Sequence, residues 1–304
     1  MRRTYLFGVL YTILGAAGFS AKAILAKLCY RYGIDGFSTL TLRMIFALPL
    51  YVIIFSYAYR KISVEQKISL KNDFLKIGLI GLFGYYFASW FDFVGLEYIS
   101  ASFERLLLFV YPTLVVIISI VWLRSKVTLR QIAALAVTYI GIAFAFWHEK
   151  SISGSNVVTG SVYVLLAALV YAVYLTATEK MTRRYSPLIF TSLALIISIG
   201  AVILHAVVIQ AHLYPQPAMV YILTLVMAVF CTVLPSLFVS KGIQLIGSST
   251  ASIIGTLGPV MTIYLAYLML DEIISGEQIA GTALVLLGIL ILTLQPARQS
   301  ADLP

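Results

Sequence analysis

The sequence predicts an all-α membrane protein of ten transmembrane helices, arranged as two inverted five-helix repeats. Three observations carry this prediction: ten apolar stretches fill almost the whole chain, Lys and Arg gather in alternate loops, and the two halves share residues in register. Of 304 residues, 61% are hydrophobic and 11% are charged, and the mean hydropathy is +1.00. A soluble domain is about half apolar and about a quarter charged, so a water-exposed surface cannot accommodate this composition.

Ten stretches are long enough to be spanning helices, because a helix needs roughly 20 mostly apolar residues to cross a bilayer. The connections between them are short, so no extramembrane domain is expected. The first stretch follows Arg2 and Arg3 and resembles a signal peptide, but its removal would break the match between the halves, so we expect a retained helix. The stretches lie near 5–27, 37–58, 74–96, 99–122, 130–147, 157–178, 188–209, 219–240, 247–270 and 279–295.

Basic residues mark one side of the predicted bundle. The alternate loops that include the N-terminus contain 14 of them, against Arg31 and Lys150 in the other loops. Positive charge stays on the cytoplasmic side, so we expect a multi-pass plasma-membrane protein with both termini in the cytoplasm. The net charge of +9 is therefore a topology signal, and no nucleic-acid partner is expected. The 14 residues are Arg2, Arg3, Arg60, Lys61, Lys67, Lys71, Arg124, Lys126, Arg130, Lys180, Arg183, Arg184, Lys241 and Arg298.

The two halves match without a gap from about 83 to 146 when the sequence is shifted by 147 residues. The predicted repeats are residues 1–150 and 151–304. Each repeat has an odd number of spans, so the second enters the membrane from the opposite side. Inverted repeats are typical of secondary transporters, whose substrate site lies between the repeats near the midplane. The matched residues are Gly95 and Gly242, Ser102 and Ser249, Pro112 and Pro259, Leu123 and Leu270, Gln131 and Gln278, and Gly141 and Gly288.

Motifs at this spacing resemble those of the ten-helix EamA-type transporters in the drug/metabolite transporter superfamily. The second half has Gly-Ser-Ser-Thr-Ala at 247–251, Gly-Pro-Val at 258–260 and Asp-Glu at 271–272, followed by Gln278, Gly281 and Gly288. The first half has Arg43, Ser-Ala-Ser at 100–102, Tyr-Pro-Thr at 111–113 and Gln131. Two departures are Phe-Ser at 19–20, where Trp-Gly-Ser is frequent, and Glu-Arg at 104–105, where many members have small apolar residues.

The resemblance covers nearly the whole chain, and it implies alternating access around a cavity lined by helices 1, 3, 4, 6, 8 and 9. It also implies a carrier, most often an exporter, of small metabolites such as amino acids. Charged groups from the first half and an apolar, hydroxyl-bearing second half suit a zwitterionic or amphipathic solute. The alternatives are an uptake carrier and a facilitative channel.

Charged residues within the apolar stretches are candidate substrate-binding groups, because a charge at the bilayer centre costs about 3 kcal/mol. Lys22 faces the cavity or makes a structural ion pair. Asp92 is its expected partner, or binds a substrate ammonium or a proton. Glu104 and Arg105 point about 100° apart on a helix, so one can face the cavity while the other contacts a neighbouring helix. Arg43 is assigned a structural role.

Aromatic and helix-breaking residues complete the candidate site. Aromatic side chains bind substrates or simply pack in the core, and Pro and Gly form static kinks or paired hinges. His205, Cys29 and Cys231 are expected to be packing residues. The candidate binding aromatics are Tyr85, Trp90 and Tyr111. The candidate hinge and packing residues are Pro112, Pro259, Gly255 and Gly258.

Other function classes find no support in the sequence. It contains no Walker A, His-Glu-x-x-His or Cys-x-x-Cys motif, so an enzyme, a metal, a cofactor and ATP-driven pumping are not expected. We expect a monomer in the lipid bilayer with a small-molecule substrate and a proton as the candidate coupling ion.

Single cysteines test the predicted topology. Cysteines placed at Lys150 or Glu277 should react with an impermeant thiol reagent added outside intact cells, because both loops are expected outside. Cysteines at Lys67 or Arg184 should react only after the membrane is opened. The reverse pattern of labelling would overturn the orientation.

Overall fold

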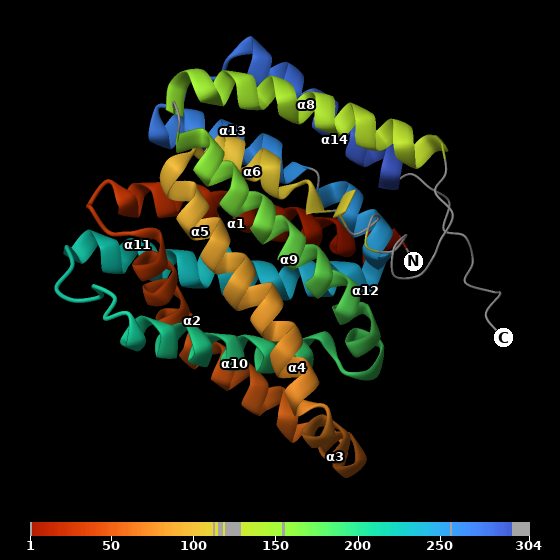
Figure 1. The fold of residues 1–304 in the computed structure, drawn as a ribbon. Coiled ribbons are helices and arrows are strands. Elements are labelled where there is room, and N and C mark those ends of the chain that lie inside the picture. The colour runs from red at the N-terminus through yellow and green to blue at the C-terminus, as the bar shows by residue number, and fades with distance from the viewer. Residues whose placement is uncertain are drawn as a thin grey trace.

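The computed structural model describes residues 2–111, 113–114, 118, 129–153, 156–255 and 257–293, and every element described there is a helix (Figure 1). The first elements are α1 (Arg2–Tyr30), α2 (Gly36–Arg60), α3 (Val64–Asn72), α4 (Phe74–Gly81), η1 (Leu82–Phe87), α5 (Ala88–Tyr98), α6 (Ala101–Leu108) and α8 (Leu129–Ser153). The later ones are α9 (Asn156–Arg184), α10 (Pro187–Val208), α11 (Ala218–Ala228), η2 (Val229–Val233), α12 (Leu234–Gly255), α13 (Leu257–Leu270) and α14 (Gly276–Thr293).

The described residues include six helical segments that are long and apolar enough to cross a membrane, so the chain is an integral membrane protein. All six coincide with predicted stretches. The other four predicted stretches hold the shorter apolar helices, α14 and α6. Within the 99–122 stretch, Pro112, 115–117 and 119–122 lie outside the described residues. The six segments are Tyr5–Tyr30, Gly36–Arg60, Phe74–Tyr98, Asn156–Tyr174, Pro187–Val208 and Ala218–Val239.

Local sequence explains where several helices begin and end. The side-chain oxygens of Asp35, Ser100 and Ser186 accept hydrogen bonds from backbone N–H groups in the first turns of α2, α6 and α10. Such caps satisfy donors that have no partner within the helix. After α1, Gly33 has a φ of +82°, a left-handed conformation that glycine adopts most easily and that commonly follows a helix end.

One helix boundary differs from the prediction. The sequence predicts an interruption between the 219–240 and 247–270 stretches, but α11, η2 and α12 follow one another without a break as far as Gly255. The next helix begins at Leu257. The predicted loop at 241–246 contains no proline, so nothing in it removes a backbone donor from the helix. Residue 256, between these two helices, lies outside the described residues.

A π-helical segment occurs at the same position in each half. η1 lies between α4 and α5, and η2 lies between α11 and α12. Their first residues, Leu82 and Val229, are 147 apart, which is the register of the sequence repeat. π-Helical turns are rare and frequently occur at functional sites. This agreement in register was not predicted from the sequence.

Helices of the two predicted halves exchange packing partners. α5 packs against α9, the first helix of the second half, and α12 packs against α1, the first helix of the first half. The second helices of the halves, α2 and α10, pack on each other. The last helices, α8 and α14, do the same and lie side by side at the top of Figure 1. A two-fold axis between the halves would produce this exchange.

Glycines set the closest contacts between helices. A Cβ atom on Gly141 of α8 would lie 2.6 Å from the Gly281 carbonyl oxygen of α14, and a Cβ on Gly281 would lie 2.6 Å from the Gly141 oxygen. On α5 and α9, a Cβ on Gly95 or Gly160 would lie 3.0 Å from the carbonyl oxygen of the other. Small residues allow this approach where helices pack within a membrane.

Substituting Gly141 by Ala should lower the thermal midpoint of the purified protein in detergent. The new Cβ meets backbone atoms that cannot rotate away, and overpacking costs about 1–3 kcal/mol. Gly200→Ala in α10 is the matched control. No other described atom lies within 4 Å of its Cβ position, and Ala gains about 1 kcal/mol over Gly in a helix. Equal shifts in the two variants would contradict the close contact of α8 with α14.

Candidate functional site

Three buried charges from three helices meet inside the bundle. Lys22 of α1 donates a hydrogen bond to Oδ2 of Asp92 on α5, and the same ammonium lies 3.8 Å from Oε1 of Glu104 on α6. The side chains of Lys22, Asp92 and Glu104 are 12%, 5% and 0% exposed. Lys22 and Asp92, which the sequence suggests as a pair, are therefore in contact. Glu104 places a second carboxyl group beside the same ammonium. We call these three residues the charged triad.

Arg105, the neighbour of Glu104, points toward different helices. Its Nε donates to Oγ1 of Thr262 on α13 at 3.2 Å, and its Nη2 donates to the Phe19 carbonyl on α1. Oγ1 of Thr262 in turn donates to the Ser20 carbonyl at 3.1 Å, and the Ser20 hydroxyl donates to the Gly258 carbonyl at 3.0 Å. These polar contacts tie α1, α6 and α13 together. The 100° between adjacent helical residues explains why Arg105 and Glu104 have separate partners.

Arg43 of α2 lies on the ring of Phe93. Its guanidinium is 4.7 Å from the ring centroid, and the Lys22 ammonium is 5.7 Å from the same centroid. Aromatic faces attract cations, so one ring stabilises both. Nη1 of Arg43 also donates to Oγ1 of Thr232 in η2 at 3.3 Å. These contacts join α2, α5 and η2, and they agree with the structural role expected for Arg43.

The predicted aromatic residues separate into two clusters. The Tyr85 and Tyr174 hydroxyls are 2.7 Å apart, and the Tyr111 ring lies 5.1 Å from the Tyr171 ring. The rings of Tyr171 and Tyr174 are stacked, so these four form one tyrosine cluster. Trp90 belongs to a second cluster, whose other members are Phe37, Tyr86, Phe91 and His205.

The described hinge candidates lie along α12 and α13. Gly258 and Pro259 are buried in α13, and Gly255 is the last described residue of α12. A Cβ on Gly258 would lie 3.3 Å from the Phe109 ring, so this position packs closely against the residue that follows α6. Its predicted partner Pro112 lies outside the described residues.

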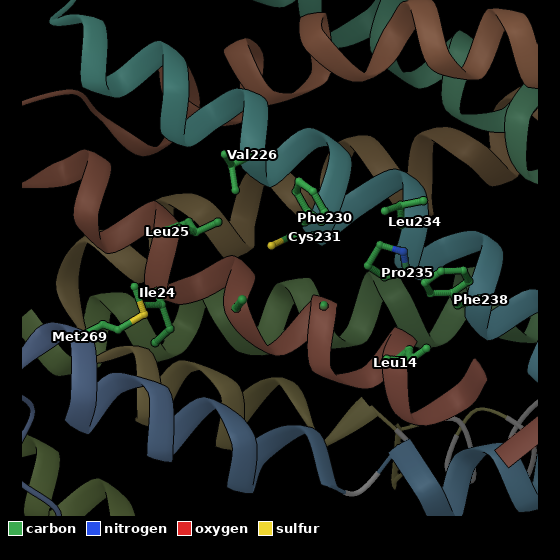
Figure 2. A pocket seen from close by; sticks show the side chains of 12 residues that line it. Leu14, Ile24, Leu25, Val226, Phe230, Cys231, Leu234, Pro235, Phe238 and Met269 are labelled. Atoms are coloured by element: carbon green, nitrogen blue, oxygen red, sulfur yellow. The ribbon is translucent and has the colours of Figure 1, made fainter. Parts of the chain in front are cut away.

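An apolar groove of about 400 Å³ runs between α1 and the α11–η2–α12 helix (Figure 2). Its residue Cys231 immediately precedes Thr232, which binds Arg43, and its residue Ala21 immediately precedes Lys22. Phe230 at its edge is 58% exposed, so the groove opens on the side of the bundle. The lining residues are Leu14, Gly18, Ala21, Ile24, Leu25, Val226, Phe230, Cys231, Leu234, Pro235, Phe238 and Met269.

Two carboxylates bind the first turn of α6. The backbone N–H and hydroxyl of Ser100 donate to Glu149 of α8, both at 2.7 Å. The N–H of Ala101 and the hydroxyl of Ser102 donate to Glu272 at 2.8 and 2.7 Å. Negative charge is favourable at a helix N-terminus. The helix that carries Glu104 and Arg105 is thus held in place by α8 and by the residues after α13, and these contacts were not predicted from the sequence.

A polar cluster around Asp73 joins α4 to the connection between α9 and α10. The carboxylate of Asp73 accepts a hydrogen bond from the Tyr185 hydroxyl at 2.8 Å and lies 2.7 Å from Arg184 and 3.3 Å from Lys76. The Tyr185 hydroxyl is also 2.9 Å from that of Ser69. The hydrogen bond from Tyr185, with help from Lys76 and Arg184, lowers the pKa of Asp73 although partial desolvation opposes the change.

Comparison with known proteins places this architecture among transporters. The EamA-like transporter family model matches residues 6–147 and 158–294. The uncharacterized transporter YcbK of Bacillus subtilis is 27% identical over 281 residues, which cover 90% of this chain and 88% of that protein. The aromatic amino acid exporter YddG of Salmonella typhimurium is 27% identical over 205 residues, which cover 63% of this chain and 66% of that one. A crystal structure with 14% identity superposes with a TM-score of 0.66 over 94% of this chain and 96% of the other, which shows a shared fold.

The Asp73 cluster should make stability depend on pH in the acid range. The pKa of Asp73 in the folded protein is below its ordinary value of about 3.9, so the stabilisation is complete above that value and is lost as the pH falls through the lowered pKa. The wild-type thermal midpoint should therefore fall more steeply than that of Asp73→Asn between about pH 5 and pH 3. Tyr185→Phe should give an intermediate slope. Parallel curves for all three proteins would show that the cluster does not contribute.

Proposed function

This chain belongs to the EamA-like transporter family, and from that premise we propose that it is a secondary transporter that exports small zwitterionic or amphipathic metabolites, such as amino acids, by alternating access. The observation that carries the proposal is the charged triad, which buries groups of both signs and whose Lys22 directly follows Ala21 of the apolar groove in the sequence.

The proposed scaffold consists of ten spans in two inverted repeats, residues 1–150 and 151–304. Three features support it: the sequence register of 147 residues, the π-helical segments in that register, and the exchange of packing partners between α5–α9 and α12–α1. Inverted repeats allow one half to rock against the other around a site near the midplane. Such rocking suits a carrier, whereas a channel does not require it.

Within the proposed site, Lys22 or Arg105 holds a substrate carboxylate, and Asp92 or Glu104 holds an ammonium group or a coupling proton. Arginine has five N–H donors, so Arg105 retains others besides the two that bind Thr262 and Phe19. The apolar groove suits an apolar side chain, since ligand pockets are on the order of 300–1,000 Å³. Export of aromatic amino acids by the relative YddG makes L-phenylalanine a suitable first probe. The tyrosine cluster and Trp90 are the aromatic contacts proposed for it.

The proposed location is the plasma membrane, with both termini in the cytoplasm and a monomer as the transporting unit. Basic residues at the Asp73 end, such as Lys67, Lys71 and Arg184, support a cytoplasmic position for that end under the positive-inside rule. The carboxylates that bind the first turn of α6 then lie at the outer end. The charged triad sits between these two sets of contacts, as a site with alternating access requires.

Counterflow of labelled L-phenylalanine in proteoliposomes tests the proposal. Wild-type protein should accelerate exchange, and Lys22→Met, Asp92→Asn, Glu104→Gln and Arg105→Met should each be scored for exchange and for folded yield. Loss of a hydrogen bond to a charged group costs about 1.5–3 kcal/mol, so a group that binds substrate should lose roughly tenfold or more in exchange while yield is kept. A structural partner should lose about 3–5 kcal/mol of stability and therefore yield.

The exposed variant Arg31→Gln is the control, because Arg31 lies outside the triad and contacts only the Leu270 carbonyl among the hydrogen bonds described for it. It should keep wild-type exchange. If the three triad variants and Arg105→Met all keep wild-type exchange, the substrate site lies elsewhere. High conductance without counterflow would identify a channel.

A further inference from the structure

We infer that Asp92 and Glu104 form a proton-binding site in which the two carboxyl groups share a single proton, and that this proton is exchanged for the ammonium group of a substrate. The inference rests on the proposed transport function. It adds the identity of the coupling ion, the residues that carry it and the chemical group with which it competes.

Three buried carboxyl oxygens lack a hydrogen-bond donor among the described residues: Oδ1 of Asp92 and both oxygens of Glu104. An unsatisfied buried acceptor costs about 1–3 kcal/mol, and more when it is charged. Asp92 and Glu104 both face the ammonium of Lys22. Two carboxylates cannot hydrogen-bond to each other because both are acceptors only, whereas a protonated carboxyl group is also a donor. One shared proton therefore satisfies Oδ1 of Asp92 and one oxygen of Glu104.

The charges around the pair also fit one proton. Lys22 is bound to Oδ2 of Asp92, and these two groups offset each other. Without a proton, Glu104 would be a second carboxylate with a fully buried side chain, 3.8 Å from an ammonium that Asp92 already holds. A buried charge without its own partner is strongly destabilising. A proton on Glu104 removes that charge.

Other charged or titratable groups near the pair have partners of their own. Arg105 binds Thr262 and Phe19, and Arg43 binds Thr232 and lies on the Phe93 ring. The Tyr30 hydroxyl donates to the Phe93 carbonyl at 2.8 Å. Lys27 lies five residues further along α1 than Lys22, in the last turn of that helix. Lys22 is thus the cation that directly faces both carboxyl groups in the described part of the chain.

A substrate ammonium supplies the second cation that the deprotonated pair requires. As it binds, the O–H bond of Glu104 breaks and the proton leaves to the aqueous side on which the site is open. The N–H groups of the ammonium then donate to the freed carboxylate. One positive charge leaves and one enters, and no electrons are transferred. After the substrate is released on the opposite side, a proton returns to the pair, so export of one ammonium group is coupled to import of one proton.

Thermal stability of the full-length protein in detergent tests the shared proton. In Glu104→Gln the amide N–H replaces the O–H donor toward Asp92, so the midpoint at neutral pH should stay within about 3 °C of wild type. Asp92→Asn leaves Lys22 unpaired and should lower the midpoint by about 10 °C or more. As the pH rises from the ordinary pKa of a glutamate, about 4.3, the wild type should lose stability relative to Glu104→Gln until the shared proton has dissociated, because the folded state binds a proton that the unfolded state has released. If Glu104→Gln falls as far as Asp92→Asn at neutral pH, Glu104 is an ionised partner of Lys22 and the inference is wrong.

Proton release tests the exchange. Phenethylamine carries an aromatic group and an ammonium, whereas 3-phenylpropionate carries the same group and a carboxylate. With weakly buffered wild-type protein and a pH indicator dye, bound phenethylamine should release about one proton per amine, as a charge-neutral swap at a single buried carboxyl requires. Glu104→Gln with phenethylamine, and wild type with 3-phenylpropionate, should release none. Absence of phenethylamine binding, or binding without release, would overturn the exchange. If only the transport proposal fails, counterflow is missing but Glu104→Gln and Asp92→Asn still differ in thermal midpoint.

Discussion

The need to neutralise charge inside an apolar bundle determines how the helices of this protein meet. A lone charge near the bilayer centre costs about 3 kcal/mol on the scale of membrane insertion, so each buried charge requires a partner on another helix. Lys22 links α1 to α5 and α6 through Asp92 and Glu104. Arg105 links α6 to α1 and α13, and Arg43 links α2 to η2 and to the ring of Phe93. These polar contacts thus fix the positions of the helices along one another, which non-directional apolar packing does not do.

The two halves contribute differently to this arrangement although their helices correspond. All members of the charged triad come from the first half, and the residues 147 positions after Asp92 and Glu104 are Val239 and Ala251. The second half instead supplies neutral acceptors, the Thr232 and Thr262 hydroxyls, which receive hydrogen bonds from Arg43 and Arg105. Hydroxyls accept these bonds without adding a charge that would need a further partner. The buried charges of this arrangement therefore come from the first half, and their neutral hydrogen-bond acceptors come from the second.

Much of the helical framework follows from the sequence because length, hydropathy and the distribution of Lys and Arg act over whole helices. The pairing of Lys22 with Asp92 follows from the scarcity of other deep charges. The partners of Arg105 do not follow, since Thr262 resembles many other helical threonines and the Phe19 acceptor is a backbone carbonyl. The division of the aromatic residues could have been anticipated, because Tyr85 and Trp90 are five residues apart and point about 140° from each other on an α-helix. The continuation of α12 through 241–246 was not predicted, because Lys241, Gly242 and Gln244 interrupt the apolar pattern although the chain there is helical.

The π-helical segments provide a structural counterpart to the sequence repeat that does not depend on proline. Where hydrogen bonds run from i to i+5, the regular ladder of the α-helix is interrupted, and such interruptions are recognised causes of helix bending. η1 contains Tyr85, whose hydroxyl is 2.7 Å from that of Tyr174 on α9, and η2 contains Thr232, which binds Arg43 on α2. Each interruption thus lies beside a polar contact to the opposite half. In the proposed alternating-access cycle, bending at these points would change the contacts between the halves with little loss of helical hydrogen bonding elsewhere.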